Sequence, residues 1–129
     1  MRVYNKWHLM IKKELKKINL THPQFVVLAS LAYLSQNGNE VTQIMISKLS
    51  GIDVMTVSQI LGLLEKHNFV KRKEHSRDTR AKAVTLNKKG EEILQKAVPL
   101  IEQIDELFFG KLDNDEEQFK HFLVRLNKE

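Results

Sequence analysis

The stretch IMISKLSGIDVMTVSQILGLLEK, residues 44–66, decides the fold that we expect for this chain. Apolar residues recur at helical spacing on both sides of Gly51, and Ser47 lies four positions before that glycine. A glycine permits a sharp backbone reversal, and a small serine lets two short helices cross closely. The stretch therefore predicts a helix-turn-helix, with one helix over 43–50 and a second over 54–68.

The outward face of the second helix favours DNA binding. On a helical wheel, four apolar side chains form the buried face: Val57, Ile60, Leu61 and Leu64. The opposite side consists of Met55, Gln59 and Gly62, flanked by Thr56, Ser58 and Leu63. No acidic residue occurs from 54 to 64, and a helix that enters the major groove needs such small or hydrogen-bonding groups. For this motif alone, the alternative is an ordinary corner between two helices.

A basic hairpin follows the two helices. The segments 69–75 and 82–87 alternate like short strands around the tip SRDTRA, residues 76–81. Residues 65–90 hold nine Lys and Arg against three acids, whereas residues 91–129 hold five against ten. A localised basic patch is typical of proteins that bind polyanions, and a hairpin beside a recognition helix lies over the adjacent minor groove. The charge pattern therefore favours DNA as the partner over a merely solvated surface.

The remaining segments predict further helices and their caps. Helical patterns cover 3–18, 21–38 and 89–109, and Pro99 is expected to kink the last of these near Val98. A final apolar stripe comprises Phe119, Phe122, Leu123 and Leu126. The side chains expected to cap helix N-termini are Thr21 with Gln24, Thr42, Asp53, and Asp113 with Glu116. A single module over 40–90 cannot cover the apolar stripes of the end helices, so the sequence predicts an obligate homodimer.

The chain resembles the MarR family of winged-helix transcriptional regulators over nearly its whole length. The segment 20–31 is similar to the start of the family's second helix, 53–72 to its recognition helix and first wing strand, and RDTRAKAVTLNKKG to its D-x-R wing followed by L-T-x-x-G. The resemblance implies a homodimer with interlocked terminal helices, a recognition helix at Met55–Leu61, and Arg80 entering a minor groove.

The sequence departs from the family pattern at two asparagines. Asn87 stands where the family usually has Thr, and Asn68 stands where Gly is common. An asparagine can cap the helix that begins near Lys88, and it also tolerates the left-handed conformation that ends a helix. Neither departure changes the expected fold.

The expected fold is mainly α with a small β-hairpin wing, in one winged helix-turn-helix domain over 1–129. Its DNA-binding lobe covers about 40–90, and its dimerisation helices cover about 1–20 and 91–129. The expected function is a sequence-specific regulator that binds double-stranded DNA, as a homodimeric repressor on a near-palindromic operator. The predicted DNA-binding residues are Thr42, Gln43, Met55, Thr56, Ser58, Gln59, Lys71, Lys73, Arg77, Asp78, Arg80 and Lys82.

At the wing tip, we expect Asp78 to orient Arg80 for the minor groove, while Arg77 and Lys82 meet phosphates. An acidic side chain beside DNA would otherwise repel phosphate, so the position of Asp78 between two arginines favours a role in holding a guanidinium. The alternative function is a winged-helix module that binds another protein without DNA.

Four aromatic residues are candidates for a small aromatic ligand that would control the regulator: Tyr4, Trp7, Phe25 and Tyr33. Core packing is the alternative, because aromatics at helical spacing usually pack inside. The five histidines lack metal-ligand spacing, cysteine is absent, and no catalytic motif appears, so we expect no metal, no cofactor and no enzyme activity. The longest apolar run, 25–34, is too short to span a membrane, so we expect a cytoplasmic protein.

Overall fold

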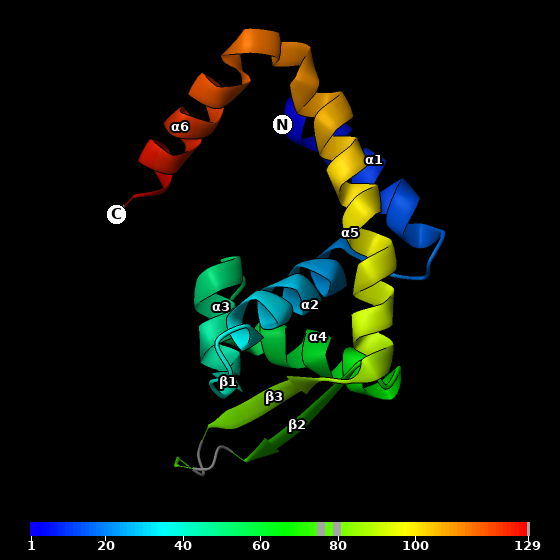
Figure 1. The fold of residues 1–129 in the computed structure, drawn as a ribbon, viewed down its shortest axis with the longest axis vertical. Coiled ribbons are helices and arrows are strands. Elements are labelled where there is room, and N and C mark those ends of the chain that lie inside the picture. Colours follow the sequence, from blue (N-terminus) through cyan, green and yellow to red (C-terminus); the bar gives the residue numbers. More distant parts are fainter. Residues whose placement is uncertain (75–76, 79–80, 129) are drawn as a thin grey trace.

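The computed structural model describes residues 1–74, 77–78 and 81–128. In chain order, its elements are α1 (Arg2–Lys16), α2 (His22–Ser35), β1 (Val41–Thr42), α3 (Gln43–Ser50), α4 (Val54–Lys66), β2 (Val70–Glu74), β3 (Lys82–Leu86), α5 (Lys88–Phe109), the 3-10 helix η1 (Gly110–Asp115) and α6 (Glu116–Asn127). Figure 1 shows a lobe of α2, α3, α4 and the sheet, from which α5 rises as a long helix. This architecture confirms the expected winged helix-turn-helix fold.

The wing is a hairpin extended by a third, very short strand. β2 and β3 pair antiparallel, with Val70 opposite Leu86. β1 pairs with the other edge of β3, with Val41 opposite Val84. The sequence predicts the hairpin but not β1, because a two-residue strand is too short to show alternation. The pairing ties the segment before α3 to the wing.

The core lies between α2 and the helix-turn-helix. α2 is apolar on most of its sides, and its residues Val27, Leu28 and Leu31 are fully buried. All four residues predicted for the buried face of α4 are buried: Val57, Ile60, Leu61 and Leu64. The end helices add further buried residues: Ile11, Leu15, Leu94, Ala97 and Ile104. One continuous core therefore joins the helix-turn-helix to parts of α1 and α5.

Three helices of the lobe begin at side-chain caps predicted from the sequence. At α2, Thr21 Oγ1 accepts from the N–H of Gln24 at 3.2 Å, and Gln24 Oε1 accepts from the N–H of Thr21 at 3.0 Å. At α3, Thr42 Oγ1 accepts from a backbone N–H of the first turn at 3.2 Å. At α4, Asp53 Oδ2 accepts from the N–H of Thr56 at 3.0 Å. These bonds satisfy donors that no helical carbonyl can reach.

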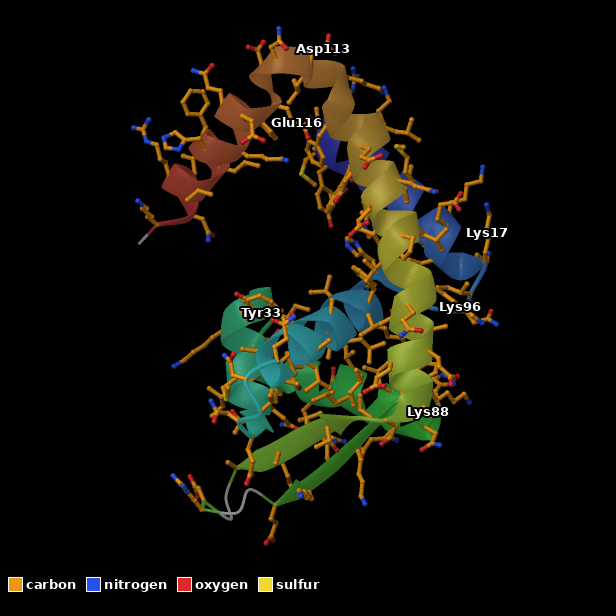
Figure 2. The ribbon with its side chains drawn as sticks, in the orientation of Figure 1. Lys17, Tyr33, Lys88, Lys96, Asp113 and Glu116 are labelled. Atoms are coloured by element: carbon orange, nitrogen blue, oxygen red, sulfur yellow. The ribbon has the colours of Figure 1, made fainter. Side chains whose placement is uncertain are left out.

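Two other predicted caps are wrong. Asn87 precedes α5 but makes no capping bond; its side-chain amide is directed to Asn68, where Nδ2 donates to the O and Oδ1 atoms at 3.2 and 3.1 Å. Asp113 and Glu116, which lie at the bend after α5 (Figure 2), form no capping box. There the chain continues as η1, and α6 begins after Asp115 without a side-chain cap. Asn68 has φ of 61°, which confirms its left-handed role.

Two helices end earlier than the sequence predicts, and one glycine lies at a close contact between two backbone segments. α2 ends at Ser35, before the expected stop at Gly38, and α4 ends at Lys66. α5 continues through Pro99 as one helix, and its kink there stays a prediction. At Gly90, near the start of α5, an added Cβ would collide with the backbone oxygen of Phe69. This close approach of two backbones requires glycine.

The far ends of the chain leave apolar side chains exposed. None of the residues of α6 is buried, and Figure 1 shows this helix turning back from the end of α5. The exposed apolar residues of the end helices include Val3, Leu9, Leu107, Phe122, Leu123, Val124 and Leu126. In the described part of the chain, no single helix has the length and composition of a membrane span; α3 and α4 meet that test only as a pair bent by 112°.

Candidate nucleic-acid interface

Three hydrogen bonds close the turn between α3 and α4. Gly51 has φ of 77°, and its N–H donates to the carbonyl of Ser47 at 3.0 Å. Ser47 Oγ donates to the carbonyl of Ile52 at 2.5 Å, and the N–H of Ile52 donates to Ser50 Oγ at 3.2 Å. The serine and the left-handed glycine therefore hold the two helices at their crossing angle, as the spacing in the sequence predicts.

The outward face of α4 offers two side chains without partners in the described structure. Met55 is 72% exposed, and Gln59 is exposed with a side chain that makes no hydrogen bond to the described residues. The hydroxyl of Thr56 instead donates to Asp53 Oδ1 at 2.6 Å. This bond, together with the one from the backbone N–H of Thr56, holds the pKa of the Asp53 carboxyl below its ordinary value. Thr56 is thus engaged in capping α4.

Arg72 on β2, which is not among the predicted DNA-binding residues, connects three elements of this surface. Its Nε and Nη2 contact the same carboxylate oxygen of Glu65, at 2.8 and 2.6 Å. Its Nη1 donates to Gln43 Oε1 at 2.9 Å and to the O and Oγ atoms of Ser58 at 3.2 and 3.1 Å. Strand alternation could have indicated this position, because Arg72 shares its face with the buried Val70.

The lysines predicted for the wing lie on two faces of the hairpin. Lys71, Lys73 and Lys82 are all exposed. Successive strand residues point to opposite faces, so Lys71 and Lys73 lie on the face away from Arg72 and α4. Lys82 is opposite Glu74 in the register and shares the face of Arg72. The wing therefore presents positive charge on both faces rather than in one patch.

A hollow at the start of α3 brings together predicted residues that are distant in sequence. Thr42, Gln43, Val54 and Lys82 are among the residues that line its volume of about 200 Å³. Lys82 supplies a charged donor from the wing, and Gln43 supplies an amide from the helix start. Such donors suit the phosphate oxygens of a nucleic-acid backbone.

The tip of the wing is described in part. Arg77 and Asp78 are exposed, and the N–H of Ala81 donates to the carbonyl of Asp78 at 3.0 Å. Arg80 lies outside the described residues. The predicted pairing of Asp78 with Arg80, and the entry of Arg80 into a minor groove, therefore stay predictions.

The four aromatic ligand candidates are placed in different surroundings. The rings of Tyr4 and Trp7 are 6.3 Å apart, and Trp7 Nε1 donates to Asp105 Oδ1 at 2.9 Å. Phe25 packs against the core from α2. Tyr33 is 64% exposed and lines a separate hollow of about 460 Å³ between α2 and α5. Tyr33 therefore does not share the surroundings of Tyr4 and Trp7.

Two histidines connect α1 with the start of α2. The Nδ1 atoms of His8 and His22 are 3.0 Å apart, and Tyr4 stacks on His8 with ring centroids 5.5 Å apart. Partial burial and then the charge of His8 lower the pKa of His22, while Asp105 acts in the opposite direction. One nitrogen of the pair must accept a hydrogen bond, so protonation of both rings would break the contact.

The helix-turn-helix and its wing match a family model described as ArnR1-like, winged-helix domain, over residues 16–104. The chain is also 36% identical over 104 residues to YdcH of Bacillus subtilis, an uncharacterised HTH-type transcriptional regulator, with 81% of this chain and 71% of YdcH covered. The chain belongs to the ArnR1-like winged-helix transcriptional regulators. Transcriptional regulator HosA of Escherichia coli O111:H- is 31% identical, with 83% of this chain and 76% of HosA covered.

Solved structures of MarR-family regulators share the fold of this winged-helix regulator. BpsR of Bordetella bronchiseptica, whose DNA binding is regulated by 6-hydroxynicotinic acid, has a TM-score of 0.85 at 25% identity, covering 99% of this chain and 90% of BpsR. MepR of Staphylococcus aureus, solved with DNA, has a TM-score of 0.87 at 23% identity, covering 97% and 90%. These similarities confirm the resemblance to the MarR family, and the protein is a DNA-binding regulator rather than an enzyme.

Proposed function

We propose that this winged-helix regulator is a homodimeric repressor that binds a near-palindromic operator in the cytoplasm. The observation that carries the proposal is the outward face of α4, where Met55 and Gln59 are exposed and no acid occurs between positions 54 and 64. Hydrogen-bonding groups on such a face suit base edges in the major groove, and the lysines of the wing suit phosphates. The resemblance to the MarR family supports repression as the sign of regulation.

A second copy of the chain completes the proposed regulator. The apolar residues exposed on α1, on the end of α5 and on α6 are more numerous than a water-facing surface favours. A two-fold dimer would cover them and would present two copies of α4. The centres of the two half-sites then lie about 10–11 bp apart, one turn of B-DNA.

Within each half-site, the residues have separate proposed roles. Gln59 reads a base edge, and an amide that contacts adenine with both its oxygen and its nitrogen discriminates by about 1–3 kcal/mol. Lys71, Lys73 and Lys82 meet phosphates on either side of the wing. Arg80 enters the minor groove, and Asp78 orients it.

Selection of bound duplexes from a random library tests this function. We expect enrichment of an inverted repeat, and tight binding should be lost when the spacer is lengthened by about half a helical turn. A matched inverted repeat with scrambled half-sites serves as the control. Recovery of unrelated sequences, or binding that survives the longer spacer unchanged, would show that the symmetric operator model is wrong.

We further propose that a small aromatic acid releases the regulator from DNA. The regulation of BpsR by 6-hydroxynicotinic acid and the aromatic side chains around Trp7 and Tyr33 support this proposal. Trp7 is the single tryptophan of the chain, so its fluorescence reports on ligands near α1.

Titration with 6-hydroxynicotinic acid should weaken operator binding, and it should quench that fluorescence over the same concentration range if the acid binds near α1. Tyr33→Ala separates the two candidate locations, because it should alter the response only if the ligand occupies the hollow between α2 and α5. Unchanged operator binding at saturating concentrations of this acid and of benzoate would contradict release by an aromatic acid.

A further inference from the structure

The hydrogen bonds of Arg72 decide which atoms Gln43 and Ser58 can offer to a bound partner. An arginine guanidinium has only donors, so every atom that it contacts must accept. Gln43 Oε1 accepts from Nη1 at 2.9 Å, and Ser58 Oγ accepts from the same nitrogen at 3.1 Å. Each oxygen keeps a second lone pair, but the guanidinium charge beside it disfavours the approach of another donor. The groups favoured for another partner are therefore the N–H bonds of the Gln43 amide and the O–H of Ser58.

The guanidinium is held firmly in this orientation. Its Nε and Nη2 are bound to Glu65, and Nη1 also donates to the carbonyl of Ser58 at 3.2 Å. The Arg72 side chain is only 21% exposed, which strengthens these charge-assisted bonds relative to bonds in water. A Cβ added at Gly62 would lie 3.6 Å from Nη2, so the guanidinium also packs closely along α4. Rotation that released Gln43 or Ser58 would break bonds to Glu65.

We propose that Arg72 is a specificity-determining residue that acts by positioning: it makes Gln43 and Ser58 hydrogen-bond donors toward DNA. The inference rests on the proposed operator binding through α3 and α4. As donors, these two side chains fit groups that accept, namely phosphate oxygens, N7 and O6 of guanine, N7 of adenine, and O4 of thymine. They do not fit the amino groups of adenine and cytosine, which would need an acceptor from the protein.

Gln59 provides the internal contrast. Its amide is exposed and makes no hydrogen bond to the described residues, so both its oxygen and its nitrogen can contact a base. Two glutamines of the same interface therefore have different chemistry. Gln59 can recognise adenine with both amide atoms, whereas Gln43 favours acceptors because the Arg72 guanidinium already donates to its oxygen.

The competing interpretation is that the Arg72 network only stabilises the lobe. In that case, a substitution of Arg72 lowers the melting temperature and weakens binding to all sequences by the same factor. The profile of base preferences separates the two interpretations, because loss of stability alone does not change which base is preferred at one operator position.

The test compares selected-site profiles for the full-length wild type, Arg72→Lys, Gln43→Ala and Ser58→Ala, with melting temperatures for each. A lysine keeps the charge but cannot reach Glu65, Gln43 and Ser58 at once. We expect Ser58→Ala or Gln43→Ala to erase a base-pair preference at a defined position, through loss of a donor to N7 or O6 of guanine, N7 of adenine or O4 of thymine. Arg72→Lys should weaken the preference at that same position by at least about 5-fold.

Lys71→Ala is the matched control, because Lys71 is the strand neighbour of Arg72 on the opposite face. It should weaken binding to all sequences and reduce the salt slope by about 1, with the base profile unchanged. If Arg72→Lys does not fold, Glu65→Ala replaces it, since the arginine stays but loses its anchor.

The inference is overturned if both arginine-network variants keep the wild-type profile, or if Gln43→Ala and Ser58→Ala change no base preference. It is also overturned if wild-type affinity falls when only the amino group of the adenine or cytosine at the affected position is removed from the duplex, because the protein would then accept from that group. The last two results are decisive even if Arg72→Lys and Glu65→Ala both fail to fold. A wild-type protein that selects no operator at all would contradict the proposed function itself, which is a distinguishable result.

Discussion

The helix-turn-helix lobe and the end helices of this regulator differ in how far their apolar side chains are buried. In the lobe, α2 and α4 each bury a set of apolar residues fully or nearly so, and Arg72 joins the polar side chains of α3 and α4. At the end of α5 and on α6, large apolar residues stay exposed. The difference teaches that one chain suffices to order the proposed DNA-reading surface, whereas the proposed dimer would cover the apolar residues that the end helices leave exposed.

The comparison breaks first if the exposed residues of α6 do not form an interface. The double variant Phe122→Glu, Leu123→Glu should be a folded monomer. It should bind the operator about 100-fold or more weakly, because a monomer lacks the linked second half-site contact that raises the effective concentration in a dimer. Sedimentation and gel shifts measure both quantities. Lys128→Gln, at an exposed position just after α6, is the control. A variant that stays dimeric with unchanged affinity would place the interface elsewhere.

A matched pair of leucine substitutions sharpens the contrast between the two regions. Leu61 is 0% exposed in α4 and Leu126 is 82% exposed in α6. In the monomeric Phe122→Glu, Leu123→Glu background, Leu61→Ala should lower the free energy of unfolding by about 2–5 kcal/mol through a lost core contact. Leu126→Ala should change it by less than about 0.5 kcal/mol. Urea denaturation gives both values, and equal effects would contradict the division into buried and exposed regions.

The start of α2 connects the end helices with the lobe, and its cap provides a smaller test. Thr21→Ala removes the acceptor for the N–H of Gln24 and should lower stability by about 1 kcal/mol. Thr21→Asn keeps an acceptor at the cap and should largely restore stability. The melting temperatures of the two variants and the wild type, measured at one protein concentration, are compared. If both variants melt together with the wild type, the capping box does not stabilise the junction.

The smallest expected effect concerns the histidine pair between α1 and α2. The pKa of His22 is below its ordinary value of 6.5 in the fold, so the unfolded chain binds more protons in that range. The stability contributed by neutral His22 is fully present above that ordinary value and is lost as pH falls through the folded value.

Melting temperature should therefore fall between about pH 7.5 and about pH 5.5, and His22→Gln should reduce this fall. His8→Gln controls for the second ring, and the carboxylate of Asp105, which opposes the shift, is present in both variants. An equal fall in wild type and His22→Gln would exclude His22 as the source.

Much of the local geometry of the candidate interface could be predicted because its signals are local. The spacing of Ser47 and Gly51 indicates the tight turn, and the periodicity of α4 identifies the buried residues and the exposed Gln59. The caps at Thr21 and Thr42 also follow from residues within one helical turn. Where a nearby element offers another partner, the same reasoning fails: Asn87 bonds to Asn68 instead of capping α5.

By itself, the sequence determined the winged-helix fold, the basic hairpin, the face of α4 that stays exposed and the caps of the lobe. These properties depend on residues one to four positions apart, whose relation is set by the regular geometry of helices and strands. The tertiary structure alone decided the pairing of β1 and the engagement of Gln43. Gln43 and Arg72 are 29 positions apart, so their hydrogen bond exists only after packing has brought α3, α4 and β2 together.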